Sequence, residues 1–184
     1  LPKNKVIGMA GILDSSRFIY FLSQELKVPV DKIKSFVLGG HGDSMVAMLG
    51  STEVDGQKIT DLIKEGKISK ERLDQIVDRT KKGGAEIVKY LEKGSAFYAP
   101  AASGVEMAEC YLKDLKKQLP CAAHLDGEYG TKDIYAGVPV IIGSGGVEKI
   151  VELQLSSDEK ENFKKSVDSV RDLFNAAKKI DTSL

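Results

Sequence analysis

The residues best suited to chemistry are a histidine on a glycine-rich turn and two charged side chains upstream of it. His41 lies within the segment GGHGDS (39–44), and Asp14 and Arg17 stand three positions apart in the segment ILDSSRF (12–18). An imidazole is the simplest proton donor and acceptor near neutral pH. A carboxylate on one ring nitrogen would fix its tautomer, and a guanidinium would bind a substrate carboxylate through two parallel hydrogen bonds.

Each of these residues also has a simpler structural interpretation. Asp14 could cap the start of a helix, with Arg17 on its surface. His41 could be a histidine that a flexible turn tolerates. The second histidine, His124, lies in an alternating run typical of a strand, and we expect it to be structural. Spacing alone therefore leaves acid–base chemistry a hypothesis.

Composition excludes several classes of function. The 184 residues include 27 Lys and Arg against 27 Asp and Glu, so no basic excess is available for nucleic acid. No apolar run approaches the roughly 20 residues of a membrane span. Cys110 and Cys121 have no disulfide or metal-site spacing, so we expect reduced thiols, no metal and a cytoplasmic location. The first residues, LPKNKVIGMAG, resemble a strand already under way, and we expect the continuation of a longer chain.

The elements that must position these residues can be read from apolar spacing and turn signals. We expect the segment 10–26 to be the end of a strand that turns into a helix capped by Asp14 or Ser15, and we expect a hairpin turn at Asp55-Gly56. The capping box of Ser156 and Glu159 starts a last helix that runs to about Lys179. The remaining expected elements are strands over 32–39 and 44–54, helices over 60–66, 69–94 and 100–119, a strand and turn over 121–130, and a hairpin over 138–155.

Two glycine clusters could be mistaken for phosphate loops. Gly83 and Gly84 lie inside the helix over 69–94, where they favour a kink or a close helix–helix contact. The cluster over 143–146 is followed by strand residues and is expected to be a turn. The sequence has no G-x-G-x-x-G motif and so no Rossmann unit. The expected fold is one α+β domain over residues 1–184, a mixed, largely antiparallel sheet packed against long helices.

The order of the motifs resembles the carboxyl-terminal half of the lactate/malate dehydrogenase family. The resemblance rests on ILDSSRF, GGHGDSMV, KGSAFYAPAASGVEMAE, LDGEYG and VPVIIGSGGVEKIVELQLSSDEKENFKKSV, which together cover essentially the whole chain. It implies that His41 exchanges a proton with the substrate ketone or alcohol, that Asp14 orients His41, and that Arg17 binds the C1 carboxylate. The segment GSAFYAPA is similar to bacterial malate dehydrogenases that are built like lactate dehydrogenases.

The same resemblance implies further residues, a cofactor and partners. Ala96 matches a position lining the substrate pocket, and Pro100 one close to the nicotinamide of NAD. Lactate-type enzymes usually carry Thr where Ala96 stands, so the smaller side chain favours the four-carbon malate and oxaloacetate of the tricarboxylic acid cycle. The family's NAD-binding Rossmann domain precedes these residues and is absent here. We therefore expect this chain alone to be inactive, and its complete enzyme to form a homodimer or homotetramer.

Three other functions stay open. Lactate dehydrogenase is the nearest, and Ala96 alone argues against it. The NAD- and metal-dependent glycosidases share the general architecture but need Cys and His metal ligands, and Cys110 and Cys121 are far from His41 in sequence. A non-catalytic oligomerisation domain that keeps the motif residues is the third.

Overall fold

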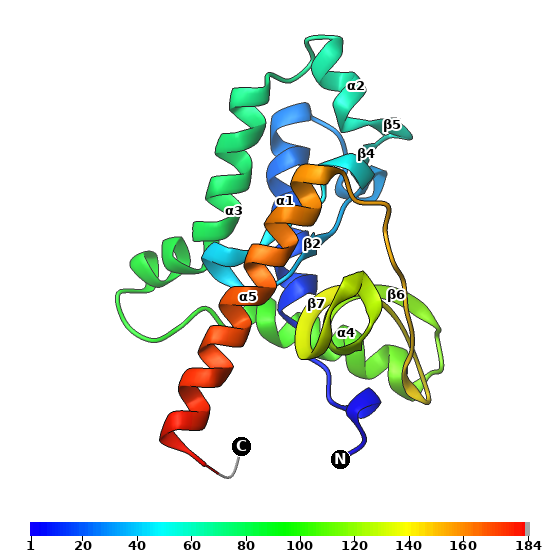
Figure 1. Ribbon diagram of the computed structural model, residues 1–184. Helices are drawn as coiled ribbons and strands as arrows, with labels where there is room; N and C mark the ends of the chain where they lie inside the picture. Colours follow the sequence, from blue (N-terminus) through cyan, green and yellow to red (C-terminus); the bar gives the residue numbers. More distant parts are fainter. Residues whose placement is uncertain (183–184) are drawn as a thin grey trace.

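The computed structural model describes residues 1–182 and confirms an α+β fold with antiparallel strand pairing (Figure 1). Helix α1 (Ala10–Leu26) lies at the centre, and all strands pair in three small sheets. The largest sheet has the order β6-β7-β8, formed by Lys117–Asp126, Lys132–Gly143 and Gly146–Ile150. The β7–β8 hairpin turns at the glycine cluster, as the sequence predicts.

Two smaller sheets connect α1 to the rest of the fold. One pairs β1 (Ile33–Lys34), β4 (Glu53–Val54) and β5 (Gln57–Lys58), with the predicted turn at Asp55-Gly56 between the last two. The other pairs β2 (Val37–Leu38) with β3 (Val46–Ala47). His41 and the 3-10 turn η3 (Gly42–Ser44) lie between β2 and β3, so the histidine turn closes a short antiparallel ladder.

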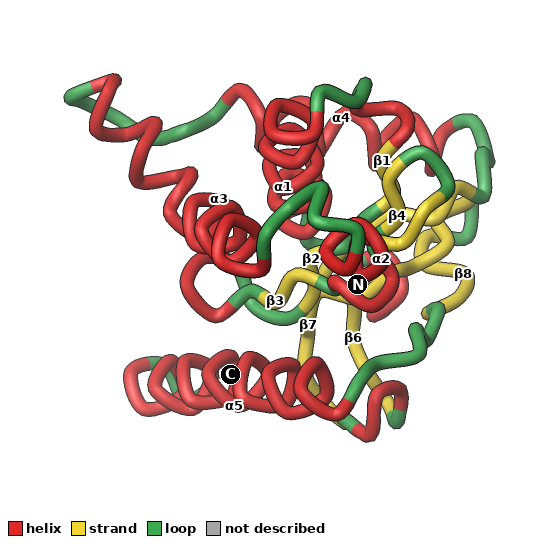
Figure 2. Tube along the Cα trace, turned by 90° about the horizontal axis from the view of Figure 1, so that it is seen from above, coloured by secondary structure: helices red, strands yellow, loops and turns green. Residues whose placement is uncertain are grey.

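Four more helices surround this framework. They are α2 (Ile59–Lys64), α3 (Lys70–Leu91), α4 (Tyr98–Leu112) and α5 (Ser157–Ile180). Helix α3 packs beside α1, and α5 runs along one side of the molecule across β7 (Figure 2). Ser156 and Glu159 form the predicted capping box at the start of α5. No helix in the described part of the chain is long and apolar enough to cross a membrane.

The apolar residues form two core clusters. Phe18 and Leu22 of α1 are fully buried against α3 and the small β1-β4-β5 sheet, together with Leu73 and Ile76. The second cluster packs the β6-β7-β8 sheet against α5 and the beginning of α1, with Phe163 and Val167 contributed by α5. Residues on opposite sides of α1 thus anchor it in both clusters.

Several predicted boundaries are wrong. Helix α1 begins at Ala10 with no side-chain cap, so Asp14 lies within the helix and is buried rather than capping it. Helix α4 ends at Leu112, because the residues from Lys117 onward form β6, which pairs with β7. The predicted strands over 32–39 and 44–54 are broken into two-residue ladders, the second by the 3-10 turn η4 (Leu49–Ser51).

Candidate active site

The fold brings His41 into direct contact with Asp14. The ring nitrogen Nδ1 of His41 lies 2.7 Å from Oδ2 of Asp14. Because a carboxylate only accepts hydrogen bonds, Nδ1 is the donor, which leaves Nε2 free to exchange a proton. The Asp14 side chain is 2% exposed and that of His41 is 53% exposed. A buried carboxylate thus holds an imidazole whose other edge faces outward.

This contact changes the acidity of the histidine. The hydrogen bond that His41 donates to Asp14 raises the pKa of His41 above its ordinary value of 6.5. Partial burial and the positive charge of Arg17 act in the opposite direction but do not cancel the effect. The contact therefore favours the imidazolium more than in a free histidine, and this form can give up a proton to a basic oxygen.

Arg17 lies beside the same carboxylate but is not hydrogen-bonded to it. Its Nη1 is 3.5 Å from Oδ1 of Asp14, and its side chain is 12% exposed. Oδ1 of Asp14 and Nε of Arg17 are both buried without a hydrogen-bond partner among the described residues. Buried polar atoms are normally paired, so this cationic group has bonding capacity to spare. A guanidinium in that state is suited to a ligand carboxylate.

The glycine pair inside α3 has a specific role in placing Arg17. A Cβ atom on Gly83 would lie 3.1 Å from Cδ and 3.4 Å from Nε of Arg17, whereas one on Gly84 would lie 3.8 Å from Nη1. Helix α3 continues unbroken through both residues. The structure therefore confirms the close helix–helix contact that the sequence predicts as one alternative. The last turns of α3 also run in a different direction from its first turns (Figures 1 and 2), so the predicted change of direction is present as well.

We expect the two glycines to respond differently to alanine. Alanine gains about 1 kcal/mol of helix propensity at either position, but at Gly83 its methyl group must displace Arg17, and overpacking costs about 1–3 kcal/mol. Gly84→Ala should therefore unfold at a higher urea concentration than Gly83→Ala. Equal midpoints would show that Arg17 yields freely to the added methyl group.

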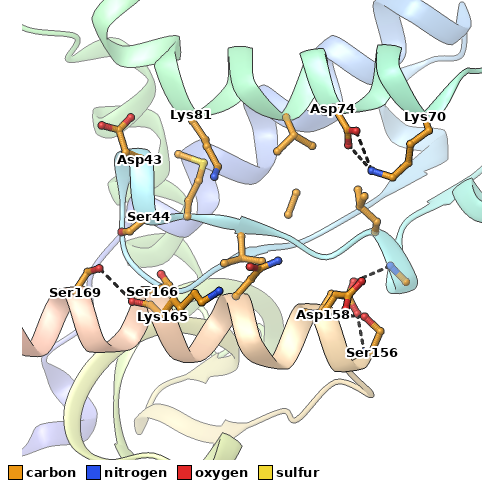
Figure 3. Close-up of a pocket in the computed structure, with 18 of the residues that line it drawn as sticks. Asp43, Ser44, Lys70, Asp74, Lys81, Ser156, Asp158, Lys165, Ser166 and Ser169 are labelled. Atoms are coloured by element: carbon orange, nitrogen blue, oxygen red, sulfur yellow. Dashed lines mark hydrogen bonds and ion pairs between the residues drawn. The ribbon is translucent and has the colours of Figure 1, made fainter.

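A small cavity of about 170 Å³ lies beside the His41–Asp14 pair. Its wall combines α1, the β2 turn, the large sheet and α5, through residues that include Ala10, Tyr135, Gly137 and Val170. A larger cleft of about 600 Å³ opens between α3 and α5, and Asp43 and Ser44 line its side nearest the histidine turn. Lys81 extends into it from α3 (Figure 3).

The other two residues predicted for the site lie on elements different from those that carry this pair. Ala96 lies in the connection between α3 and α4, and Pro100 is the third residue of α4. Neither lines the cavity beside His41 among the residues described. His124 lies in β6, where its Nε2 is 3.0 Å from Nζ of Lys3 and its ring packs edge-on against Tyr135. The structure thus brings together three of the five predicted residues: His41, Asp14 and Arg17.

Sequence reasoning missed one residue that contacts the histidine turn. Ser166 of α5 accepts a hydrogen bond from the backbone N–H of Gly40 at 2.8 Å. A signal for it was present, because Ser166 interrupts the apolar stripe formed by Phe163, Val167 and Val170. A polar residue on a core-facing stripe needs a partner.

Comparison with known protein families shows to which family the chain belongs. The family described as lactate/malate dehydrogenase, alpha/beta C-terminal domain, matches residues 12–180. The chain belongs to this family. It is 65% identical to a malate dehydrogenase of Pelagibacter ubique and 56% identical to one of Caulobacter vibrioides, over all 184 residues. It spans 58% of the length of each of these relatives.

Solved structures of the same family have the same fold. A malate dehydrogenase of Cryptosporidium parvum is 46% identical with a TM-score of 0.93, and the match covers 97% of this chain and 57% of that one. A lactate dehydrogenase of the same organism, solved with lactic acid and nicotinamide adenine dinucleotide, is 45% identical with a TM-score of 0.94. That match covers 96% of this chain and 56% of the other. Both branches of the dehydrogenase family thus share this fold.

Proposed function

We propose that residues 1–184 form the catalytic and substrate-binding domain of an NAD-dependent malate dehydrogenase. The observation that carries the proposal is the His41–Asp14–Arg17 arrangement: a raised-pKa imidazole beside a guanidinium with unused bonding capacity. The names of the two curated relatives support malate as the substrate, and the identity to both is above half. The lactate dehydrogenase solved with its cofactor supports NAD as the hydride carrier.

The cavity beside His41 is too small to hold a dinucleotide by itself. The cavity beside His41, about 170 Å³, is far smaller than the roughly 300–1,000 Å³ of ligand pockets. We therefore propose that most contacts to NAD come from a preceding domain, since the relatives are longer than this chain. Pro100 is proposed to lie near the nicotinamide and Ala96 near the substrate once that domain is in place.

The proposed chemistry interconverts malate and oxaloacetate. Arg17 binds the C1 carboxylate and fixes the substrate keto group near His41. As C2 accepts a hydride, Nε2 of His41 donates its proton to the carbonyl oxygen, which becomes the hydroxyl group of malate. Asp14 holds the imidazolium in the correct orientation throughout and stabilises its charge. In the reverse direction neutral His41 removes the hydroxyl proton while C2 loses the hydride.

The proposal also covers the oligomeric state and the cellular location of the enzyme. Exposed apolar side chains on α4, Tyr98, Val105 and Leu112, support association with a second domain or a second copy, as in a homodimer or homotetramer. The two buried free thiols support a reducing, cytoplasmic location, and the substrate is an acid of the tricarboxylic acid cycle. Lactate dehydrogenase is the alternative that the similarity to the second Cryptosporidium structure favours.

A fusion protein tests the proposed function directly. The 184 residues would be joined to the segment that precedes the matched region in the Pelagibacter relative, and NADH oxidation would be followed with oxaloacetate or pyruvate. We expect oxaloacetate to be preferred, no turnover by the 184-residue chain alone, and a loss of about 100- to 10,000-fold in kcat for His41→Asn. A preference for pyruvate would favour the lactate alternative. A fully active His41→Asn variant would refute the proposed role of the histidine.

A further inference from the structure

The two residues that precede His41 are hydrogen-bonded on two sides of the turn. On one side, Gly39 exchanges two backbone hydrogen bonds with Gly137 of β7, at 2.8 and 2.7 Å. On the other side, the N–H of Gly40 donates to Oγ of Ser166 on α5, at 2.8 Å. The backbone immediately before His41 is thus bonded both to β7 and to α5.

Ser166 is unlike the other serine one turn later on the same helix. Its side chain is 2% exposed, within the cluster that contains Phe163 and Val167. Ser169 is exposed, and its hydroxyl donates to the carbonyl oxygen of Lys165 in its own helix. The hydroxyl of Ser166 instead reaches outside α5 and accepts from the histidine turn. The buried hydroxyl of Ser166 thus satisfies a backbone donor of the histidine turn.

Packing around the turn is tight enough to make that contact specific. A Cβ atom on Gly39 would lie 2.2 Å from Oγ of Ser166, and Gly39 has a positive φ of 87° that favours glycine. A Cβ atom on Gly40 would lie 2.4 Å from Oγ of Ser44 and 3.1 Å from Cγ2 of Val170. Both glycines therefore allow α5 to approach the backbone closely, which gives Ser166 access to the Gly40 N–H.

We propose that Ser166 is a positioning residue for His41, acting through the Gly40 N–H to fix the turn that presents the imidazole to Asp14. The proposal rests on the proposed function in taking His41 as the proton donor, but the contact itself does not depend on it. The side chain of His41 is half exposed and has Asp14 as its hydrogen-bond partner. Its backbone is therefore what determines whether the 2.7 Å contact is kept.

Loss of the Ser166 hydroxyl has a defined consequence. The Gly40 N–H would lose its acceptor, and the turn would move away from α5. The Nδ1–Oδ2 contact would then lengthen, and the pKa of His41 would fall toward 6.5. The charged groups that set this pKa, Asp14 and Arg17, are both on α1 and are not altered by a change on α5. A lowered pKa would thus report movement of His41.

The test compares Ser166→Ala with Ser169→Ala in the 184-residue protein. His41 would be titrated by NMR, and hydrogen exchange would be measured at the Gly40 amide. We expect Ser166→Ala to lower the pKa of His41 and to speed Gly40 exchange by about tenfold or more, with Ser169→Ala unchanged in both. Ser166→Thr, which keeps the hydroxyl group, should restore both values. If Ser166→Ala matches Ser169→Ala, the proposal is wrong.

A second variant and the fusion protein complete the test. Ser166→Cys keeps the side-chain shape, at a slightly larger volume, with a much weaker acceptor, so it applies if the alanine variant does not fold. Wild-type values of both readouts in the cysteine variant would overturn the proposal. In the active fusion protein, Ser166→Ala should lower kcat and leave KM for oxaloacetate nearly unchanged, because Arg17 is not moved. An inactive wild-type fusion would count against the proposed function, while the NMR comparison would still decide the role of Ser166.

Discussion

Replacing Asp14 with asparagine is expected to lower the pKa of His41 and to reduce turnover by the fusion protein about 100-fold or more. The amide removes the negative charge that favours the imidazolium, and the hydrogen bond that His41 donates to Asp14 is the largest cause of the raised pKa. An asparagine amide group can also donate to Nδ1, which would place the ring proton on Nε2. The measurements are an NMR titration of His41 and kcat with oxaloacetate.

The same substitution should change how stability depends on pH. The folded protein raises the pKa of His41 above 6.5, so it holds the imidazolium proton more tightly than the unfolded chain does. This stabilising contribution is fully present below about pH 6.5 and is lost as pH rises through the higher folded value. The urea midpoint of Asp14→Asn relative to wild type should therefore be lower at acidic pH than at alkaline pH.

A matched control separates this effect from a general loss of charge. Asp31 is exposed in the short turn η2 (Val30–Lys32), and it is not among the charged groups that shift the pKa of His41. Asp31→Asn makes the same chemical change and should leave the titration of His41 and kcat unchanged. If Asp14→Asn shifts neither the pKa nor kcat, the 2.7 Å contact does not govern the histidine.

The sequence could predict those contacts of the site that join residues close together in the chain. Asp14 and Arg17 share a helix face by their spacing alone, and their link to His41 follows from the family resemblance. The contact that encloses Arg17 could not be assigned, because Gly83 is 66 residues away and a glycine pair in a helix has several explanations. Nothing local distinguishes a glycine that makes room for a side chain from one that bends the helix.

The errors in the predicted fold have a similar origin. Asp14 has the residue type of a helix cap, but the helix begins four residues earlier because Gly11 and Ile12 pack against β6 and its cluster. Residues after Leu112 have helical spacing, yet pairing with β7 takes Leu119 into the sheet. In both places a tertiary contact overrides a local preference. Where the local signal is self-contained, as at the Ser156 capping box, prediction and structure agree.

The largest expected effect on stability is that of Phe18→Ala. Phe18 is fully buried on α1 within the cluster that includes Leu22 and Leu73. Removing a buried phenylalanine ring costs the transfer free energy of its atoms and leaves a cavity, so the free energy of unfolding should fall by about 3–5 kcal/mol. Urea denaturation followed by circular dichroism measures this change.

Tyr20→Ala is the matched control, because it removes an aromatic ring from the same helix at a side chain that is 53% exposed. It should cost about 1 kcal/mol or less, and an equal loss in the two variants would contradict the assignment of Phe18 to the core. Phe18 directly follows Arg17 and lies one turn after Asp14, so the ring also fixes the part of α1 that carries both charges. In the folded fraction, Phe18→Ala should therefore lower the pKa of His41, and Tyr20→Ala should not. The core and the proton-transfer pair would then be linked through a single helix.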